Sequence, residues 1–580
     1  MNGQSLAVIE PAKISDDPAG QQSVRTAKRL FHVIAIMVPA IAITSFFLCL
    51  WRYSYNFPYF DDFEVILGFL NSFLTTENLS NKVHLLFEQH GEHRVVFDRA
   101  IALAEYWISG KIDFRSLILI GNAALAVLLI LFYRAVEQRR QFHPLALAPI
   151  ALILFNFRYF QTIFWAMAAL QNLWVLCFAF GAFYFLFQAP VYATFIAILL
   201  GLFATYTSGN GMAVFVAGAI VLALNRQLWT GKAIIWSLGG VATIASYFYG
   251  YVKPLNHPSV IKPLTDDPLG YVAYVLALFG GVFTENIAAA VVIGSVLVGF
   301  AGYLTFRKYF RENPIIYTLI LFLLLTSIGS GAARFEFGIE QALVSRYTII
   351  STLFVVCCYL AFLPLVQNKI KTGGWIVILV AAVCFHYTTY AKYLPEKKQQ
   401  KAEFEKNYAR IVQGKLTHFD FGWPPLDIRR QLPRQVLRTA DSLRYFPFKF
   451  KDVAEILDSL PSANDCETAY VFERFQQVGP AVVVFSGWAL IRGVSSDDVI
   501  PVLCLKEEHG NPANYMVLQK LPRTDVGQIY PNDHTDYSQA GFGTVFNRNE
   551  IKPGKYTVSL LLATADFKTE IEAGPTVLGQ

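Results

Sequence analysis

The chain has 580 residues, of which 54% are hydrophobic and only 16% are charged, whereas an ordinary soluble chain is about a quarter charged. This composition excludes a disordered chain, a collagen-like chain and a single soluble globule. The net charge of +6 is spread over many short segments, so it does not indicate nucleic-acid binding. Long apolar runs fill residues 31–391, and residues 392–580 have an ordinary soluble composition. We therefore predict a polytopic α-helical membrane protein with a polar C-terminal domain.

The membrane part is expected to contain about eleven spans. A polar tail, residues 1–30, precedes the apolar stretch Phe31–Trp51, which is long enough to remain as a first transmembrane helix. The stretch Tyr271–Phe283 is apolar but only half as long as a span, which favours a re-entrant or interfacial helix. Candidate spans begin near residues 31, 117, 145, 168, 191, 212, 232, 286, 314, 348 and 375.

The orientation of these spans follows from lysine and arginine, which concentrate in cytoplasmic loops. An odd number of spans then places both the long loop 52–115 and the C-terminal domain outside the cytoplasm. We expect a bacterial inner membrane protein with this orientation. The basic connections contain Arg25, Lys28, Arg29, Arg134, Arg139, Arg140, Arg226, Lys232, Arg307, Lys308, Arg311, Lys369 and Lys371.

The long loop 52–115 begins with two adjacent carboxylates, Asp61 and Asp62, among aromatic residues. One of them could cap a helix. A partly desolvated carboxylate near a membrane surface is also suited to act as a general base. Apolar residues at helical spacing in Val65–Leu74 and Val95–Trp107 predict helices that lie along the membrane surface.

A second polar cluster in the same loop contains His90, Glu92, His93 and Arg94. Histidines three residues apart can share a divalent metal ion when they lie on one helical turn. Gly91 interrupts the helical pattern, however, and hydrogen bonding within the loop or to a substrate is the other interpretation. Both interpretations remain open from the sequence.

Three later loops on the same predicted side carry further polar residues: Arg158, Asn210, and the pair Arg334 and Arg346. Arginine at a membrane boundary often extends its charged end toward lipid headgroups. A planar guanidinium also suits bidentate binding of a phosphate. Because these loops share one side of the membrane, we predict a functional site on the outer face.

The C-terminal part is expected to consist of a helical linker, residues 392–465, and a β-sandwich, residues 466–580. Short β-like runs such as Val482–Phe485 and Tyr556–Leu562 are separated by turn signals. Trp488 could stack on a sugar or lie in a core. Cys466 and Cys504 could form a disulfide if the domain faces an oxidising compartment.

The sequence resembles the GT-C membrane glycosyltransferases over about residues 31–391, on the basis of its many spans, its external domain and the carboxylate pair Asp61-Asp62. Protein mannosyltransferase-type members have an Asp-Glu pair there instead. The block Gly487-Trp488-Ala489 looks like part of an accessory β-domain of some bacterial glycosyltransferases. Four short blocks are also similar to a group of bacterial membrane proteins related to this class: Tyr59-Phe60-Asp61-Asp62-Phe63, Glu92-His93-Arg94, Thr207-Ser208-Gly209-Asn210-Gly211 and Ser345-Arg346-Tyr347.

This resemblance implies an inverting glycosyltransferase that moves a sugar from a polyprenyl-phosphate donor to a cell-envelope acceptor such as lipopolysaccharide or another lipid or glycan. We expect Asp61 to be the catalytic base, with Asp62 orienting it or the acceptor. No cofactor is implied with certainty, and a divalent metal at His90 and His93 stays open. Expected partners are the donor, the acceptor and membrane lipids. Substrate-binding residues would be Glu92, His93, Arg94 and Asn210, and phosphate-binding residues Arg158, Arg334 and Arg346.

Two other classes remain open. A lipid-glycan transporter or flippase usually has internal repeats, broken helices and ionisable residues near the middle of the membrane, whereas the predicted spans here are nearly uncharged. A non-catalytic protein of envelope assembly is supported only by the predicted β-domain.

Overall fold

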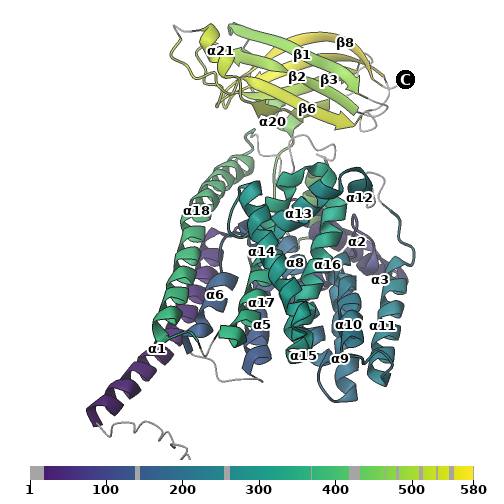
Figure 1. Ribbon diagram of the computed structural model, residues 1–580. Helices are drawn as coiled ribbons and strands as arrows, with labels where there is room; N and C mark the ends of the chain where they lie inside the picture. The colour runs from purple at the N-terminus through teal and green to yellow at the C-terminus, as the bar shows by residue number, and fades with distance from the viewer. Residues whose placement is uncertain are drawn as a thin grey trace, which may run out of the picture.

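The computed structural model describes residues 18–137, 144–253, 262–366, 369–416, 431–463, 465–478, 482–507, 514–530, 533–547, 551 and 554–578. Its helices lie side by side, and its β-strands form a separate layer beyond one end of them (Figure 1). The helix α18 (Thr372–Val412) runs along the side of the helical part and extends toward the strands. The predicted division into an apolar helical part and a C-terminal β part is therefore confirmed.

Seven helices among the described residues are long and apolar enough to cross a membrane. The predicted spans near residues 191 and 212 correspond to shorter apolar helices, and the one near 145 contains only a short helix, α6 (Ala148–Leu154). The half-length stretch at 271–283 forms α13 (Pro268–Gly280). The seven long helices are α1 (Pro18–Tyr53), α5 (Phe114–Glu137), α8 (Ala166–Leu186), α14 (Ile287–Phe306), α16 (Pro314–Arg334), α17 (Thr348–Val366) and α18.

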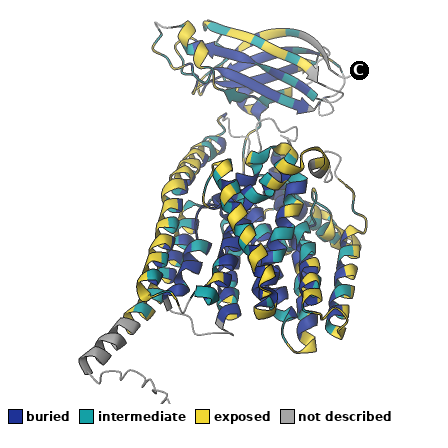
Figure 2. Cartoon of the chain, viewed as in Figure 1, coloured by how far each residue is buried: buried dark blue, intermediate teal, exposed yellow. Residues whose placement is uncertain are grey.

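Burial explains why these helices need an apolar surrounding. Figure 2 shows buried residues between the helices and exposed residues along their outer sides. Those exposed residues include large apolar side chains, such as Ile36 of α1 and Val296 of α14, each 69% exposed. Since water would penalise such extended apolar surfaces, the helical part is that of a membrane protein.

The loop between α1 and α5 contains a series of short helices. A π-helix, η1 (Phe63–Gly68), begins directly after Asp62. The linker region packs onto it, because the Asn71 amide donates to the Val436 carbonyl at 3.0 Å and the Tyr445 hydroxyl donates to the Leu67 carbonyl at 2.9 Å. In this contact α19 (Gln431–Ser442) packs against η1 and α2 (Phe69–Thr75), and the loop continues through α3 (Leu79–Phe87) and α4 (Val96–Ser109).

The shorter helices on the side of α8 also contribute to the site described below. Tight packing against glycines joins them: a side chain at Gly211 would overlap the Ala204 backbone, and one at Gly218 would overlap Trp236. These helices and turns are α9 (Val191–Thr207), η3 (Gly209–Met212), α10 (Ala213–Leu224) and α11 (Gly231–Phe248).

The described strands form two antiparallel four-stranded sheets, ordered β1-β2-β6-β5 and β4-β3-β7-β8. Alternate residues from both sheets meet in one apolar cluster, as Phe485 of β2 and Leu503 of β3 illustrate. The strands are β1 (Thr468–Val478), β2 (Val482–Ile491), β3 (Ile500–Glu507), β4 (Asn514–Val517), β5 (Gln519–Leu521), β6 (Gly541–Asn547), β7 (Gly554–Ala563) and β8 (Lys568–Leu578).

The predicted disulfide between Cys466 and Cys504 is wrong, because both residues are free cysteines. Strand alternation gives the physical reason. Cys504 points to the outer face of its sheet, where it packs in a cluster with Leu457 of α20 (Val453–Ser459). Cys466 instead packs against the apolar cluster between the sheets. Trp488 is 9% exposed and packs with Val526, so it is a core residue of the β part.

Candidate functional site

A tight turn, residues 90–93, carries the central acidic residue of the site. The backbones of His90 and His93 exchange hydrogen bonds of 2.8 and 2.9 Å. Gly91 lies between them with a φ of +54°, a conformation that costs glycine little and other residues more. The turn therefore presents Glu92 at its tip instead of continuing a helix, and the two histidines are paired through their backbones.

Arg94 anchors this turn to α11. Its guanidinium donates to the carbonyls of Phe87, Tyr247 and Tyr249 at 2.5, 2.9 and 2.6 Å. The fork of donors on arginine suits such a set of acceptors. Arg94 is predicted to bind substrate, but the structure places its side chain behind the turn, among backbone carbonyls, where it holds the loop.

Two adjoining cavities meet at this turn. The polar cavity has a volume of about 460 Å³ and is lined by Asp61, Glu64, His90 and Gln171, among others. The deep cavity has a volume of about 360 Å³ and extends between α8, α10, α16 and α17. Six residues line both cavities, which shows that the two adjoin: Glu92, His93, Asn172, Arg334, Arg346 and Tyr347.

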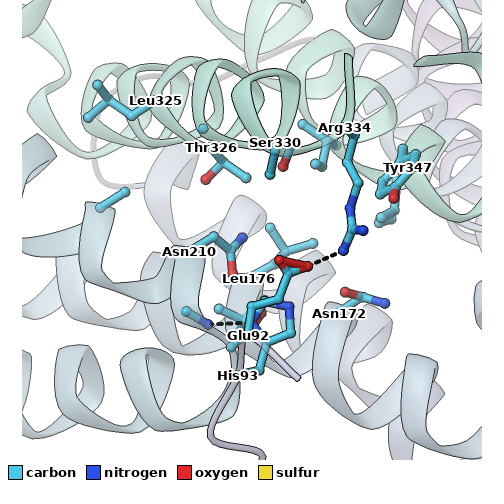
Figure 3. A pocket seen from close by; sticks show the side chains of 18 of the residues that line it. Glu92, His93, Asn172, Leu176, Asn210, Leu325, Thr326, Ser330, Arg334 and Tyr347 are labelled. Atoms are coloured by element: carbon cyan, nitrogen blue, oxygen red, sulfur yellow. Dashed lines mark hydrogen bonds and ion pairs between the residues drawn. The ribbon is translucent and has the colours of Figure 1, made fainter. Parts of the chain in front are cut away.

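An ion pair between Glu92 and Arg334 lies at the junction of the cavities (Figure 3). Arg334 is the last residue of α16, so its side chain extends from the end of a membrane helix. The His93 Nδ1 atom accepts a hydrogen bond of 3.2 Å from the Gly209 backbone. Residues of the first loop and of α16, which are predicted to share one site, therefore lie together here.

The deep cavity is polar at the junction and apolar along α16. Asn210, which is predicted to bind substrate, lines it, and the amide oxygen of Asn210 is buried without a hydrogen-bond partner. Further along α16 the cavity reaches Leu325, which lies nine residues, or about 13 Å, from Arg334 along the helix axis. Arg346 lines both cavities, and its Nε atom is also buried without a partner.

The structure separates the roles of the two predicted catalytic carboxylates. Asp61 lines the polar cavity. Asp62 is 1% exposed and accepts hydrogen bonds from the backbone of Tyr59 at 3.0 Å and of Met167 at 2.9 Å. Met167 lies in the first turn of α8, so Asp62 caps that helix from a distant loop. Burial raises the pKa of Asp62 to about 8, although the two backbone hydrogen bonds act in the opposite direction.

Arg158 does not reach either cavity. Its guanidinium donates to the carbonyls of Gly281 at 2.9 Å and Leu343 at 3.1 Å, and it lies 3.5 Å from the Glu285 carboxylate. The residue is 4% exposed and borders a separate cavity of about 180 Å³. The structure thus gives Arg158 a role in joining loops, apart from Arg334 and Arg346.

The predicted metal site does not fit the described residues. In the part of the chain that the structure describes, no three His, Cys, Asp or Glu side chains are arranged to hold a metal ion. His93 accepts a backbone hydrogen bond through Nδ1, and His90 Nδ1 lies 3.4 Å from the Glu64 carboxylate.

Several residues of the polar cavity are not among the predicted site residues. One of them is Glu64, which pairs with the predicted residue His90, and another is Gln171, whose Nε2 atom is buried without a hydrogen-bond partner. Asn172 and Tyr347 line both cavities. Asn172 and Gln171 lie in the first turns of the apolar helix α8. Two adjacent polar residues near the end of an apolar span are a sequence feature that could have identified them as site residues.

No family model matches the sequence, and no curated protein matches it either.

Proposed function

We propose that the protein is a membrane glycosyltransferase of the GT-C type, which moves a sugar from a polyprenyl-phosphate donor to a cell-envelope glycan or lipid. One observation carries the proposal: the Asp61 carboxylate and the Arg334 and Arg346 guanidinium groups line the same cavity. These residues come from the first long loop and from the ends of α16 and the turn before α17. A base and an anion-binding pair are the two elements that this transfer requires.

The shape of the joined cavities supports an amphiphilic donor. The deep cavity is bordered by apolar residues such as Leu176, Leu325 and Ile349, and its charged residues lie at one end. An isoprenoid chain would bury apolar surface along α16, and each Å² of buried apolar surface contributes about 25 cal/mol of favourable free energy. Its phosphate would then lie beside Arg334 and Arg346. Hydrogen bonds between a guanidinium and a phosphate are charge-assisted and are stronger than those between neutral groups.

The proposed transfer is a single displacement at the anomeric carbon. The acceptor hydroxyl attacks this carbon while its proton passes to the Asp61 carboxylate. The bond between the anomeric carbon and the phosphate oxygen breaks, and its electron pair stays on the lipid phosphate. Arg334 and Arg346 stabilise the charge that develops there. Attack from the face opposite the leaving phosphate inverts the anomeric configuration.

A transporter or flippase is the alternative from another class. Its function would require charged or ion-binding groups toward the middle of the membrane. The charged residues that line the deep cavity are Glu92, Arg334 and Arg346, which all lie at its junction with the polar cavity. This distribution favours chemistry at the membrane surface over transfer across it.

The same proposal includes the finer topology. The shorter helices α9, α10 and α11, together with the segment that contains α6, would bring the seven long helices to eleven spans. The catalytic cavity and the two β-sheets would then lie on the outer side of a bacterial inner membrane, with the sheets packed as a β-sandwich. Labelling of single cysteines in intact cells with an impermeant reagent tests the sidedness.

Activity of the purified full-length protein tests the reaction. The protein in lipid nanodiscs is incubated with a panel of polyprenyl-phosphate sugars and an envelope lipid acceptor, and products are detected by mass spectrometry. Asp61→Asn should lower kcat about 10²–10⁴-fold, because it removes the general base. The matched control is Glu77→Gln, an exposed acid in the same loop, which should retain activity. Full activity of Asp61→Asn would end the assignment of the base, and no product from any donor would overturn the reaction class.

A further inference from the structure

The ion pair between Glu92 and Arg334 occupies the place where the proposed function requires an anion. Both residues line both cavities, and Figure 3 shows the carboxylate facing the guanidinium across the junction. Their side chains are only 20% and 30% exposed. A donor phosphate that binds Arg334 must therefore displace or share the carboxylate that already binds it.

The two partners are held with different rigidity. The backbone carbonyl of Glu92 accepts a hydrogen bond of 3.0 Å from the Tyr247 hydroxyl, and His93 and Arg94 anchor the following residues. Arg334, in contrast, is a long side chain at the end of α16, followed by a short 3₁₀ turn, η4 (Phe335–Phe337). An incoming anion would thus move the guanidinium and leave the Glu92 turn in place.

We propose that Glu92 is a built-in competitor for Arg334, which weakens anion binding and helps to expel the phosphate product. The inference rests on the proposed function. A donor phosphodiester carries one negative charge, whereas the product phosphate monoester carries between one and two at neutral pH. The product would otherwise bind Arg334 and Arg346 more tightly than the donor does. The return of the Glu92 carboxylate to Arg334 lowers the affinity for both anions, which matters most for release of the more tightly bound product. Glu92 is therefore a positioning residue for the guanidinium.

Direct binding tests this role without turnover. Farnesyl phosphate and inorganic phosphate are titrated separately into the purified full-length protein in nanodiscs, and farnesol serves as the uncharged probe. Glu92→Gln should bind both phosphates about 3- to 10-fold more tightly, with farnesol unchanged, because the competing charge is gone. Arg334→Gln should bind phosphates more weakly. In the double variant Glu92→Gln/Arg334→Gln the gain should disappear, because the two residues act through one interaction.

Glu336→Gln is the matched control, because Glu336 is an exposed acid two residues from Arg334. It should leave phosphate affinity within about two-fold. An equal gain in Glu336→Gln would attribute the effect to general charge and overturn the competitor role. Unchanged or weaker binding by Glu92→Gln, in protein with unaltered thermal unfolding, would also overturn it.

The outcomes separate the two proposals. If the wild type binds farnesyl phosphate and Arg334→Gln weakens it, the anion site stands and only the Glu92 result decides the competitor role. If the wild type binds neither phosphate, both proposals fail. In turnover, Glu92→Gln should lower the donor KM and kcat together, since a retained product slows each cycle. A lower kcat with a raised donor KM would contradict product expulsion.

Discussion

Removal of Asp62 should destabilise the protein, because its carboxyl group is a structural acceptor. Asp62→Ala would leave the backbone N–H groups of Tyr59 and Met167 without their acceptor. A buried polar group that loses its partner costs about 1–3 kcal/mol, so the loss should be roughly 2–6 kcal/mol of unfolding free energy for the two. The beginning of loop 52–115, which carries Asp61, would then lose its contact with the first turn of α8.

The same residue predicts a pH dependence. Burial raises the folded-state pKa of Asp62 from 3.8 to about 8, whereas the unfolded chain has the ordinary value. Between these two values the folded protein holds a proton that the unfolded chain has lost. The contribution of Asp62 to stability is therefore complete below about pH 4 and falls as the pH rises toward 8. Asp62→Asn does not titrate and should flatten this dependence.

Thermal unfolding of purified protein in nanodiscs, followed between pH 4.5 and 8.5, measures both effects. Asp61→Asn is the matched comparison, because Asp61 is adjacent to Asp62 but lines the polar cavity. Its replacement should change the unfolding free energy by less than about 1 kcal/mol. If Asp62→Ala unfolds at the same temperature as Asp61→Asn, the capping role is refuted. An unchanged pH dependence in Asp62→Asn would refute the raised pKa.

Two further predictions concern residues whose role the structure changes. Arg94→Lys should loosen the Glu92 turn, because three guanidinium nitrogens donate to the carbonyls of Phe87, Tyr247 and Tyr249 and a single ammonium nitrogen cannot replace all three. Limited proteolysis should then cut the loop 52–115 faster than in the wild type. Equal cleavage rates would contradict the anchoring role of Arg94. Trp488→Ala should destabilise the β part by about 3–5 kcal/mol, since it removes a core side chain. Thermal unfolding measures this loss, and an unchanged unfolding temperature would contradict the core role.

The sequence predicted those features that depend on local composition. Apolar runs identified the long helices, because each span must satisfy its backbone within one continuous segment. Grouping polar loops by side brought Asp61, Glu92, Arg334 and Arg346 into one predicted site, and the structure places all four around the polar cavity. This grouping needed no contact information, since loops on one side of a membrane share a thin layer of space.

The sequence failed where side-chain direction decided the role. Arg158 lies in a loop near the site, yet its side chain turns toward Gly281 and Leu343. Asp61 and Asp62 are adjacent, but the bend into η1 sends one to the cavity and the other into the protein. Loop packing sets both directions, and no periodic pattern in the sequence records it.

The site also depends on contacts between distant segments, as the Glu92–Arg334 pair illustrates, since its partners lie 242 positions apart in the sequence. Each membrane helix is stabilised by its own apolar residues, whereas this pair requires two separate segments to pack together. Local sequence therefore determines the individual spans, whereas the packing of α8, α10, α16 and α17 determines the geometry of the site. A substitution in those contacts should alter anion binding even where it leaves every helix intact.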